Sequence, residues 1–290
     1  MIRMRTLGYS LTSICLYFEI SRQAYYKRVS KRNSKEQLYQ KVEDIVIDNR
    51  RIKSRAGLRS IFYKEKLFKM LGINQFEKQM SVLGYSLKPY RSQFKTTDSK
   101  GYYYMFKNLI QGLKIRRENH VIVGDITYYQ SYGKVYYIFQ FRDYYTMEVK
   151  GLTGGSTLEG KHAERCLRQV FRYNKQHKYQ YQLILHTDRG SQYRSHKFQL
   201  MLRNAEIRPS HADNCFENGL SERTNGILKN EYLIDYDIKS VKQLNKVLKK
   251  VKYQINEVWP SKTLGYKTPK QFETWTRELD EPERPIRTVK

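Results

Sequence analysis

The chain has 290 residues, and its 55 Lys and Arg residues outnumber its 28 Asp and Glu residues, which gives a formal net charge of +27. This length allows about two domains, and 39% hydrophobic with 29% charged residues excludes a disordered chain. The apolar runs are too short to cross a bilayer. None of signal length follows the basic N-terminus, so we expect a cytoplasmic protein without membrane contact.

The basic residues are distributed along the whole chain. A surface this positive repels itself unless a polyanion is bound, so the charge favours nucleic acid over a membrane surface as the partner. The three cysteines, Cys15, Cys166 and Cys215, are far apart, and we expect free thiols in a reducing compartment. The six His residues show no spacing typical of a zinc site.

Residues 11–28 predict two short helices joined by a turn, and a basic linker over 30–35 follows them. Ser21 is a suitable cap for the second helix, whose polar and basic residues are typical of a helix-turn-helix DNA reader. An ordinary helical hairpin explains the pattern equally well. The residues expected to contact DNA from this helix are Arg22, Gln23, Tyr26, Lys27 and Arg28.

Three further segments, 36–49, 57–70 and 74–83, carry apolar residues at helical spacing. Gly84 is well placed as the C-terminal cap of the last one. The polar and basic stretch 88–101 predicts a linker. We therefore expect an all-helical DNA-binding module, with a second helix-turn-helix as one option.

The pattern changes at residue 120, where three β-rich segments predict a hairpin through Gly133 that continues as a meander. Two more strands, over 181–187 and at Ile207, alternate with three predicted helices, which gives the order of a mixed α/β fold. The helices are expected over 157–175, 195–204 and about 217–232, and a long amphipathic helix with a lysine-rich outer face follows over 239–256. The predicted domains are therefore 1–35, 36–100, 101–235 and 236–290.

Two acids occupy strand positions where acids are unexpected. Asp125 interrupts one β-rich segment and Asp188 ends the next apolar strand, so neighbouring strands would bring both carboxylates to one region. Glu222 lies early in the following helix, and Lys229 shares its face two turns later. Clustered carboxylates raise each other's pKa, a cost that Mg²⁺ removes. Each acid also has an ordinary interpretation, as a turn residue, a surface ion pair with Arg189, or a solvated helix residue.

Three ordered motifs carry a resemblance to a known family: GDITYY (124–129), ILHTDRGSQY (184–193) and ENGLSERTNGILKNE (217–231). In this order they resemble the Asp-Asp-Glu transposases of bacterial insertion sequences, most closely the second-frame (OrfB) proteins of insertion sequence family three. SRQAYYKR, AGLRSIFYKEKL, TTDSK and LGYKTPKQF resemble the same family. The resemblance implies an RNase H-like integrase core with a mixed sheet, preceded by helix-turn-helix modules and followed by a helical tail.

The resemblance also implies the site. Asp125, Asp188 and Glu222 would be the catalytic residues and the ligands of two Mg²⁺ ions, with Mn²⁺ as a substitute. Lys229 would contact the element-end DNA, Gly190 and Gln192 would shape the loop beside Asp188, and His186 would support it. Asp143 would be structural. Further DNA contacts are expected from Arg189, Gln192, Arg223 and Asn225.

The implied function is metal-dependent phosphodiester hydrolysis followed by strand transfer, on double-stranded DNA at the element's terminal repeats and at its target. An upstream OrfA product, fused or separate, would be a partner, and at least a dimer would form on DNA in the bacterial cytoplasm, associated with the nucleoid. A catalytically inert DNA-binding regulator or end-binding subunit is the alternative. An RNase H-type nuclease and a tyrosine recombinase rank below it.

Three features depart from the family pattern: one spacing, one pair of residues and one glycine. Only 33 residues separate Asp188 from Glu222, two fewer than is usual. Trp259 and Ser261 stand where Arg and His are common, which puts a DNA contact there in doubt. Gly124 stands where Thr is frequent, and we expect this change to be tolerated.

Overall fold

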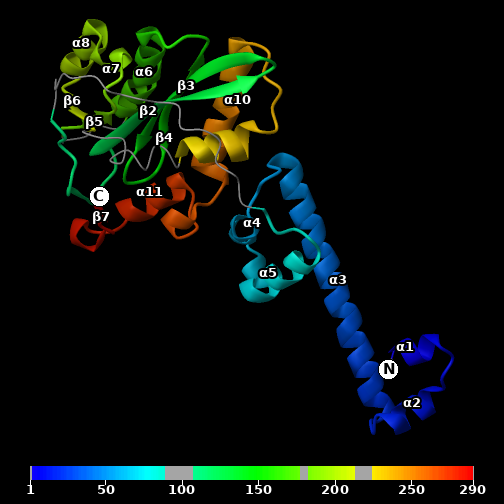
Figure 1. The fold of residues 1–290 in the computed structure, drawn as a ribbon. Coiled ribbons are helices and arrows are strands. Elements are labelled where there is room, and N and C mark those ends of the chain that lie inside the picture. Colours follow the sequence, from blue (N-terminus) through cyan, green and yellow to red (C-terminus); the bar gives the residue numbers. More distant parts are fainter. Residues whose placement is uncertain (1, 89–106, 177–181, 213–223, 290) are drawn as a thin grey trace.

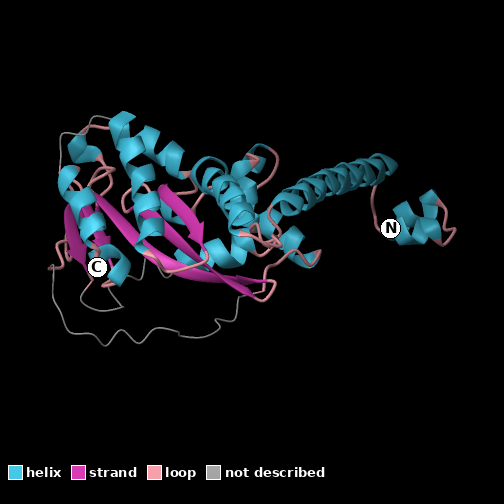
Figure 2. Cartoon of the chain, turned by 90° about the horizontal axis from the view of Figure 1, so that it is seen from above, coloured by secondary structure: helices cyan, strands magenta, loops and turns pink. Residues whose placement is uncertain are grey.

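The structure is a computed structural model that describes residues 2–88, 107–176, 182–212 and 224–289. A long helix leads from a small N-terminal helical group to a larger α/β body that contains the sheet (Figures 1 and 2). Within the described ranges, no helix is long and apolar enough to span a membrane.

The N-terminal group consists of α1 (Ile2–Thr6), α2 (Leu11–Tyr17) and the start of α3 (Arg22–Ile52). The Ser21 hydroxyl accepts a hydrogen bond from the Ala24 amide at 3.1 Å, so the predicted cap is confirmed. The predicted linker over 30–35 is wrong, because α3 continues through it to Ile52. The linker sequence contains neither Gly nor Pro to stop a helix, and Arg32 pairs with Glu36 one turn later.

The helical module contains α4 (Leu58–Lys64), the short 3₁₀ helix η1 (Leu67–Lys69) and α5 (Ile73–Val82). The single helix predicted over 57–70 is wrong, since Lys66 adopts a left-handed backbone conformation with φ 53° and divides it. Gly84 ends α5 as predicted: its φ is +85°, and the Tyr85 amide donates to the Met80 carbonyl at 2.9 Å.

A five-stranded mixed sheet forms the centre of the body, in the order β4-β3-β2-β5-β6. Its strands are β2 (Val121–Ser131), β3 (Lys134–Asp143), β4 (Val149–Gly155), β5 (Ile184–Thr187) and β6 (Arg208–His211). The first three pair antiparallel, whereas β5 pairs parallel with β2 and β6 parallel with β5. Tyr132 and Gly133 both have positive φ in the β2–β3 turn, which suits a tight hairpin. This arrangement confirms the predicted hairpin and meander and the RNase H-like α/β core.

Helices cover both faces of the sheet. On β4, a Cβ at Gly151 or Gly155 would meet α6 (Gly160–Gln176), whereas a Cβ at Gly154 would meet Leu244 of α10 (Val241–Tyr253) at 2.2 Å. Because successive strand residues point to opposite faces, α6 and α10 lie on opposite sides of β4. The short helices α7 (Ser191–Arg194) and α8 (His196–Asn204) contact α6.

The C-terminal part returns to the body. A π-helical stretch, η3 (Leu228–Leu233), precedes α10, and a second one, η4 (Gln254–Val258), extends it, so the long amphipathic helix is confirmed. The short 3₁₀ helix η5 (Lys262–Leu264), α11 (Pro269–Arg277) and a further turn η6 (Glu281–Glu283) follow. The last strand, β7 (Arg287–Thr288), pairs with β1 (Lys114–Ile115).

One apolar cluster joins the helical module to the body: it contains Val46 and Phe62 from the module together with Tyr136, Leu233 and Leu248 from the body. A smaller cluster around Ile14 holds the N-terminal group together. Cys15 and Cys166 are buried free thiols, as expected, and Cys215 lies outside the described residues. The predicted four-part division of the chain stays a proposal, and α3 runs through its first boundary.

Candidate active site

Asp125 lies in the middle of β2, and its carboxylate is held from the neighbouring helical layer. Its pairing partner on β3 is Gln140. The Gln140 amide donates to the Asn225 side-chain oxygen at 2.6 Å, and the Asn225 amide donates to the Asp125 carboxylate at 2.6 Å. Gln140 also donates to the Thr224 hydroxyl at 3.2 Å. Residues 224–227 are helical, so these bonds fix the described start of that helix over Asp125.

Asp188 follows the last residue of β5, the strand parallel to β2. Val121 pairs with Ile184 and Val123 with His186. Continuing this register places Asp188 level with Asp125 and on the same face, because parallel neighbours keep their alternation. The Gly190 amide donates to the Asp188 carboxylate at 3.0 Å. Burial raises the pKa of Asp188, while this bond and the charge of His211 lower it.

Tyr193 connects the two acids electrostatically. Its side chain is 1% exposed and its ring packs on Phe141 and Phe198. Burial raises the pKa of Tyr193 well above its usual value, and the negative charges of Asp188 and Asp125 act in the same direction. The sequence reasoning missed Tyr193 and Gln140, although Tyr193 ends the second motif and Gln140 lies one strand from Asp125.

The loop after Asp188 is fixed by β6. The Asp188 carbonyl and the His211 ring are 2.9 Å apart, and the Arg189 side chain donates to the Ala212 carbonyl at 3.1 Å. Between β5 and β6, the His186 ring and the Ser210 hydroxyl are 2.9 Å apart. A Cβ at Gly190 would come within 2.8 Å of Gln192 and 3.0 Å of Asp188, so a glycine suits this close approach.

Of the remaining predicted site residues near the acids, some are not described by the structure. Glu222 and Arg223 fall outside the described residues, as does the TTDSK segment. Lys229 lies on η3 with its ammonium group 4.8 Å from the ring centre of Tyr128.

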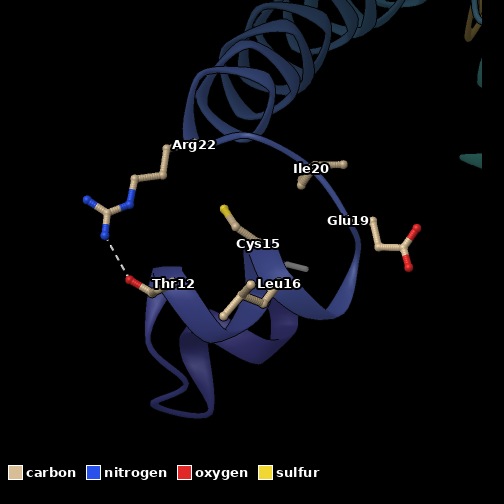
Figure 3. A pocket seen from close by; sticks show the side chains of 6 residues that line it. All are labelled: Thr12, Cys15, Leu16, Glu19, Ile20 and Arg22. Atoms are coloured by element: carbon tan, nitrogen blue, oxygen red, sulfur yellow. Dashed lines mark hydrogen bonds between the residues drawn. The ribbon is translucent and has the colours of Figure 1, made fainter.

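Five predicted DNA-contacting residues lie at the start of α3, remote from the two acids (Figure 1). Their side chains are exposed: Arg22, Gln23, Tyr26, Lys27 and Arg28. Arg22 donates to the Thr12 hydroxyl at 2.8 Å. Figure 3 shows this bond at the edge of a pocket between α2 and α3 that Cys15, Leu16 and Ile20 also line. The structure therefore brings Asp125 and Asp188 together and does not bring the α3 residues to them.

Two departures from the family pattern, at Gly124 and Trp259, have structural explanations, whereas the shortened spacing ends at Glu222, outside the described residues. A Cβ at Gly124 would approach the Phe141 ring to 2.3 Å, so in this chain the ring occupies the space of a larger side chain. Trp259 is 3% exposed, which leaves no surface for a DNA contact. Its ring lies 5.1 Å from the ammonium group of Lys53. Asp143 is fully buried and accepts hydrogen bonds from the amides of Asn119 and Thr146, contacts that suit a structural residue.

The donor set suits a hard divalent cation. Two carboxylates on adjacent strands offer oxygen ligands only, which Mg²⁺ and Mn²⁺ prefer. Desolvation makes an ionised Asp188 costly, and a nearby divalent charge would lower that cost. The described residues contribute two of the three predicted acids to this place.

Two family models, both described as an integrase core domain, match residues 115–214 and 203–269, and together they cover just over half of the chain. The transposase for insertion sequence element IS904 of Lactococcus lactis is 29% identical over 210 residues, which cover 71% of this chain and 82% of that protein. An uncharacterized 31 kDa protein of insertion element IS600 from Shigella sonnei is 25% identical and covers 77% of this chain and 83% of its own length. The putative transposase InsK for IS150 of Escherichia coli is also 25% identical, over 77% and 79%.

The sequence identity to solved structures is lower than the identity to these relatives. A simian T-cell lymphotropic virus intasome in complex with a PP2A regulatory subunit matches with a TM-score of 0.48 and 20% identity, over 79% of this chain and 78% of that one. The HTLV-2 integrase catalytic core domain in complex with magnesium matches with a TM-score of 0.42 and 22% identity, over 58% and 99%. The motif order, the mixed sheet and the sequence relatives agree: the chain belongs to the Asp-Asp-Glu transposases of bacterial insertion sequences, with an integrase core of the family-three OrfB type.

Proposed function

We propose that the chain cuts and joins DNA at the ends of its insertion sequence, with Asp125, Asp188 and Glu222 as the catalytic acids. The observation that carries this proposal is the level position of Asp125 and Asp188 on adjacent parallel strands. Hydrolysis would free a 3′-hydroxyl at the element's end, and that hydroxyl would then attack a phosphodiester of the target. Neither step requires a covalent intermediate with the protein.

Two Mg²⁺ ions, with Mn²⁺ as a substitute, would be held by these acids and would supply charge stabilisation at the phosphate and a bound water of lowered pKa. The chain's own residues prepare the ligands. Asn225 orients one oxygen of Asp125, and the Gly190 amide orients one oxygen of Asp188. These fixed donors keep both carboxylates in place before DNA arrives, which reduces the reorganisation needed for reaction.

The DNA contacts remain predictions of this proposal. The exposed residues at the start of α3 would read the terminal repeat, and Lys229, Arg189, Gln192 and Arg223 would hold DNA near the acids. Asn225 has its side chain committed to Asp125 and Gln140, so its contacts support a positioning role more directly than a DNA contact. An upstream OrfA product and at least a dimer on DNA complete the assembly that we propose for the bacterial nucleoid.

A strand-transfer assay on end-sequence DNA with Mg²⁺ tests the proposal. Asp188→Asn should reduce product to below roughly one-thousandth of wild type, the scale of removing one member of a catalytic set. Asp280→Asn removes an exposed carboxylate at the start of η6 and should leave activity unchanged. Full activity of Asp188→Asn would overturn the catalytic assignment. A wild-type chain that binds end DNA without any metal-dependent nicking would support the alternative, an inert end-binding subunit.

A further inference from the structure

We propose that the exposed lysines of α10 form a second DNA-binding surface, which contacts the phosphate backbone of a duplex independently of its sequence. These residues are named the α10 lysine stripe and are Lys242, Lys246, Lys249 and Lys250. All four are exposed. Their spacing of four, three and one residues places them on one side of the helix.

The orientation of α10 is fixed by its inner side. Leu244 packs against Gly154 of β4, and the Asn245 side chain bonds both the amide and the carbonyl of Gly154, at 3.0 and 2.9 Å. Lys252, on the same helix, turns inward instead and donates to the Gln169 side chain at 3.3 Å. The packing of α10 on β4 therefore makes the stripe face outward. The same packing directs Lys252 inward, where it donates a hydrogen bond within the protein.

The charge of the stripe is not neutralised within the described part of the chain. α10 contains no acidic residue, and none of the four lysines forms an ion pair with a residue that the structure describes. Other exposed lysines do: Lys161 pairs with Glu159 at 2.7 Å and Lys197 with Glu164 at 3.0 Å. Four unneutralised charges on one helix face favour a polyanionic partner.

The length of the stripe matches a DNA strand. Lys242 to Lys250 spans roughly 12 Å at the helical rise per residue, and one strand of a duplex presents about three or four phosphates over that distance. Lysine is a point charge that binds phosphate without the planar geometry that reads a base edge. The contact should therefore be insensitive to sequence. An interfacial membrane helix is excluded, because the apolar side of α10 is already buried against β4.

The stripe and the candidate active site share one face of the sheet. Gly154, which faces α10, pairs with Ile138, and Ile138 pairs with Thr127. Paired residues in a sheet point to the same face, and Asp125 lies two residues from Thr127. DNA lying along α10 is thus on the same side of the sheet as the two acids, a suitable place for duplex that flanks the reacting phosphate.

Binding of the full chain to a mixed-sequence duplex, measured by fluorescence anisotropy at several KCl concentrations without divalent metal, tests the inference. Combining Lys242→Gln, Lys246→Gln and Lys249→Gln should reduce the slope of log affinity against log salt by about 2 to 3 and weaken binding at low salt roughly tenfold or more. Changing the same three residues to Arg should restore both values. The matched control combines Arg165→Gln, Arg172→Gln and Arg203→Gln, which removes three exposed charges from α6 and α8.

The control should retain most of the wild-type slope, since only the net charge changes. Two results would overturn the inference: a wild-type slope in the Gln triple variant, or an equal loss in the control, which would assign the effect to net charge alone. A loss on end-sequence DNA without any loss on mixed-sequence DNA would also overturn it. Because the assay contains no metal and measures no product, its outcome is independent of the catalytic proposal.

Discussion

The two faces of the central sheet differ in the side chains that they bury. On the face covered by α6, α7 and α8, large apolar side chains such as Phe139, Phe141 and Leu167 fill the space, each at most 1% exposed. On the other face, Asp125 is held through Asn225 and Gln140, and a buried lysine connects the helical module to η3. The first face, called the apolar face, is filled by apolar packing, whereas the second, called the polar face, combines an apolar cluster around α10 with positioned charged groups.

The largest expected effect on stability belongs to the apolar face. Phe139→Ala should lower the free energy of unfolding by about 3–5 kcal/mol, because it removes a buried ring and leaves a cavity. Chemical denaturation of the full chain measures this. Phe68→Ala removes a ring that is 55% exposed and should cost much less. Equal losses from the two variants would contradict the assignment of stability to this face.

On the polar face, truncating a side chain to Ala should reduce the rate of strand transfer and leave the free energy of unfolding nearly unchanged. Asn225→Ala removes the donor to Asp125, and strand transfer should fall about 10- to 100-fold, the range seen when a group that orients a ligand is lost. The affinity for end DNA should stay close to wild type, which separates positioning from DNA contact. Asn230→Ala, in the same helix, serves as the control. A large loss of DNA affinity with unchanged turnover would instead make Asn225 a DNA contact.

The packing of the apolar face can be tested at Gly124. Gly124→Ala should cost about 1–3 kcal/mol, since its Cβ would overlap the Phe141 ring and overpack the core. Adding Phe141→Leu should recover part of that loss. Gly72→Ala is the matched control, because a Cβ at Gly72 meets nothing within 4 Å. Thermal unfolding of the three variants measures the comparison, and a neutral Gly124→Ala would show that the ring can move away freely.

Local signals predicted the elements that local chemistry determines. Ser21 and Gly84 mark helix ends through short-range hydrogen bonds, and Gly133 marks a hairpin turn. Apolar runs next to Asp125 and Asp188 identified both as acids at strand positions that would meet if the strands were neighbours, and the pairing of β2 with β5 meets that condition. The continuous α3 was missed because a basic sequence was interpreted as a linker, although charged residues with long side chains favour helix.

Contacts between residues remote in the sequence were not predictable from local patterns. Gln140 and Asn225 meet because the helix that follows β6 in the chain lies over β3, and nothing near either residue in the sequence indicates this. Lys53 gives the clearest case. In the sequence it is one basic residue among many, yet its side chain is 7% exposed beside a carboxylate 178 residues away. Only the packing of the helical module on the body explains why this lysine is buried.

Lys53 offers the test with the smallest expected change in free energy, and it addresses a single ion pair. Lys53 donates to Glu231 of η3 at 2.8 Å and lies 4.2 Å from the Tyr232 ring centre, so it joins the end of α3 to the helix whose described part starts over Asp125. A double-mutant cycle with Lys53→Met and Glu231→Gln should give a coupling energy of about 1 kcal/mol, a value kept low because Glu231 is partly exposed to solvent.

The matched cycle uses Arg51 and Asp48, an ion pair of the same length whose side chains are 75% and 68% exposed. Its coupling should be near zero, since solvent screens both charges. If the Lys53–Glu231 coupling is equally small, the polar face contains no energetic connection through this pair, and the other contacts, including the shared apolar cluster, hold the module to the body. If it is larger, burial of the lysine strengthens its attraction to Glu231, and the polar face contributes to stability as well as to chemistry.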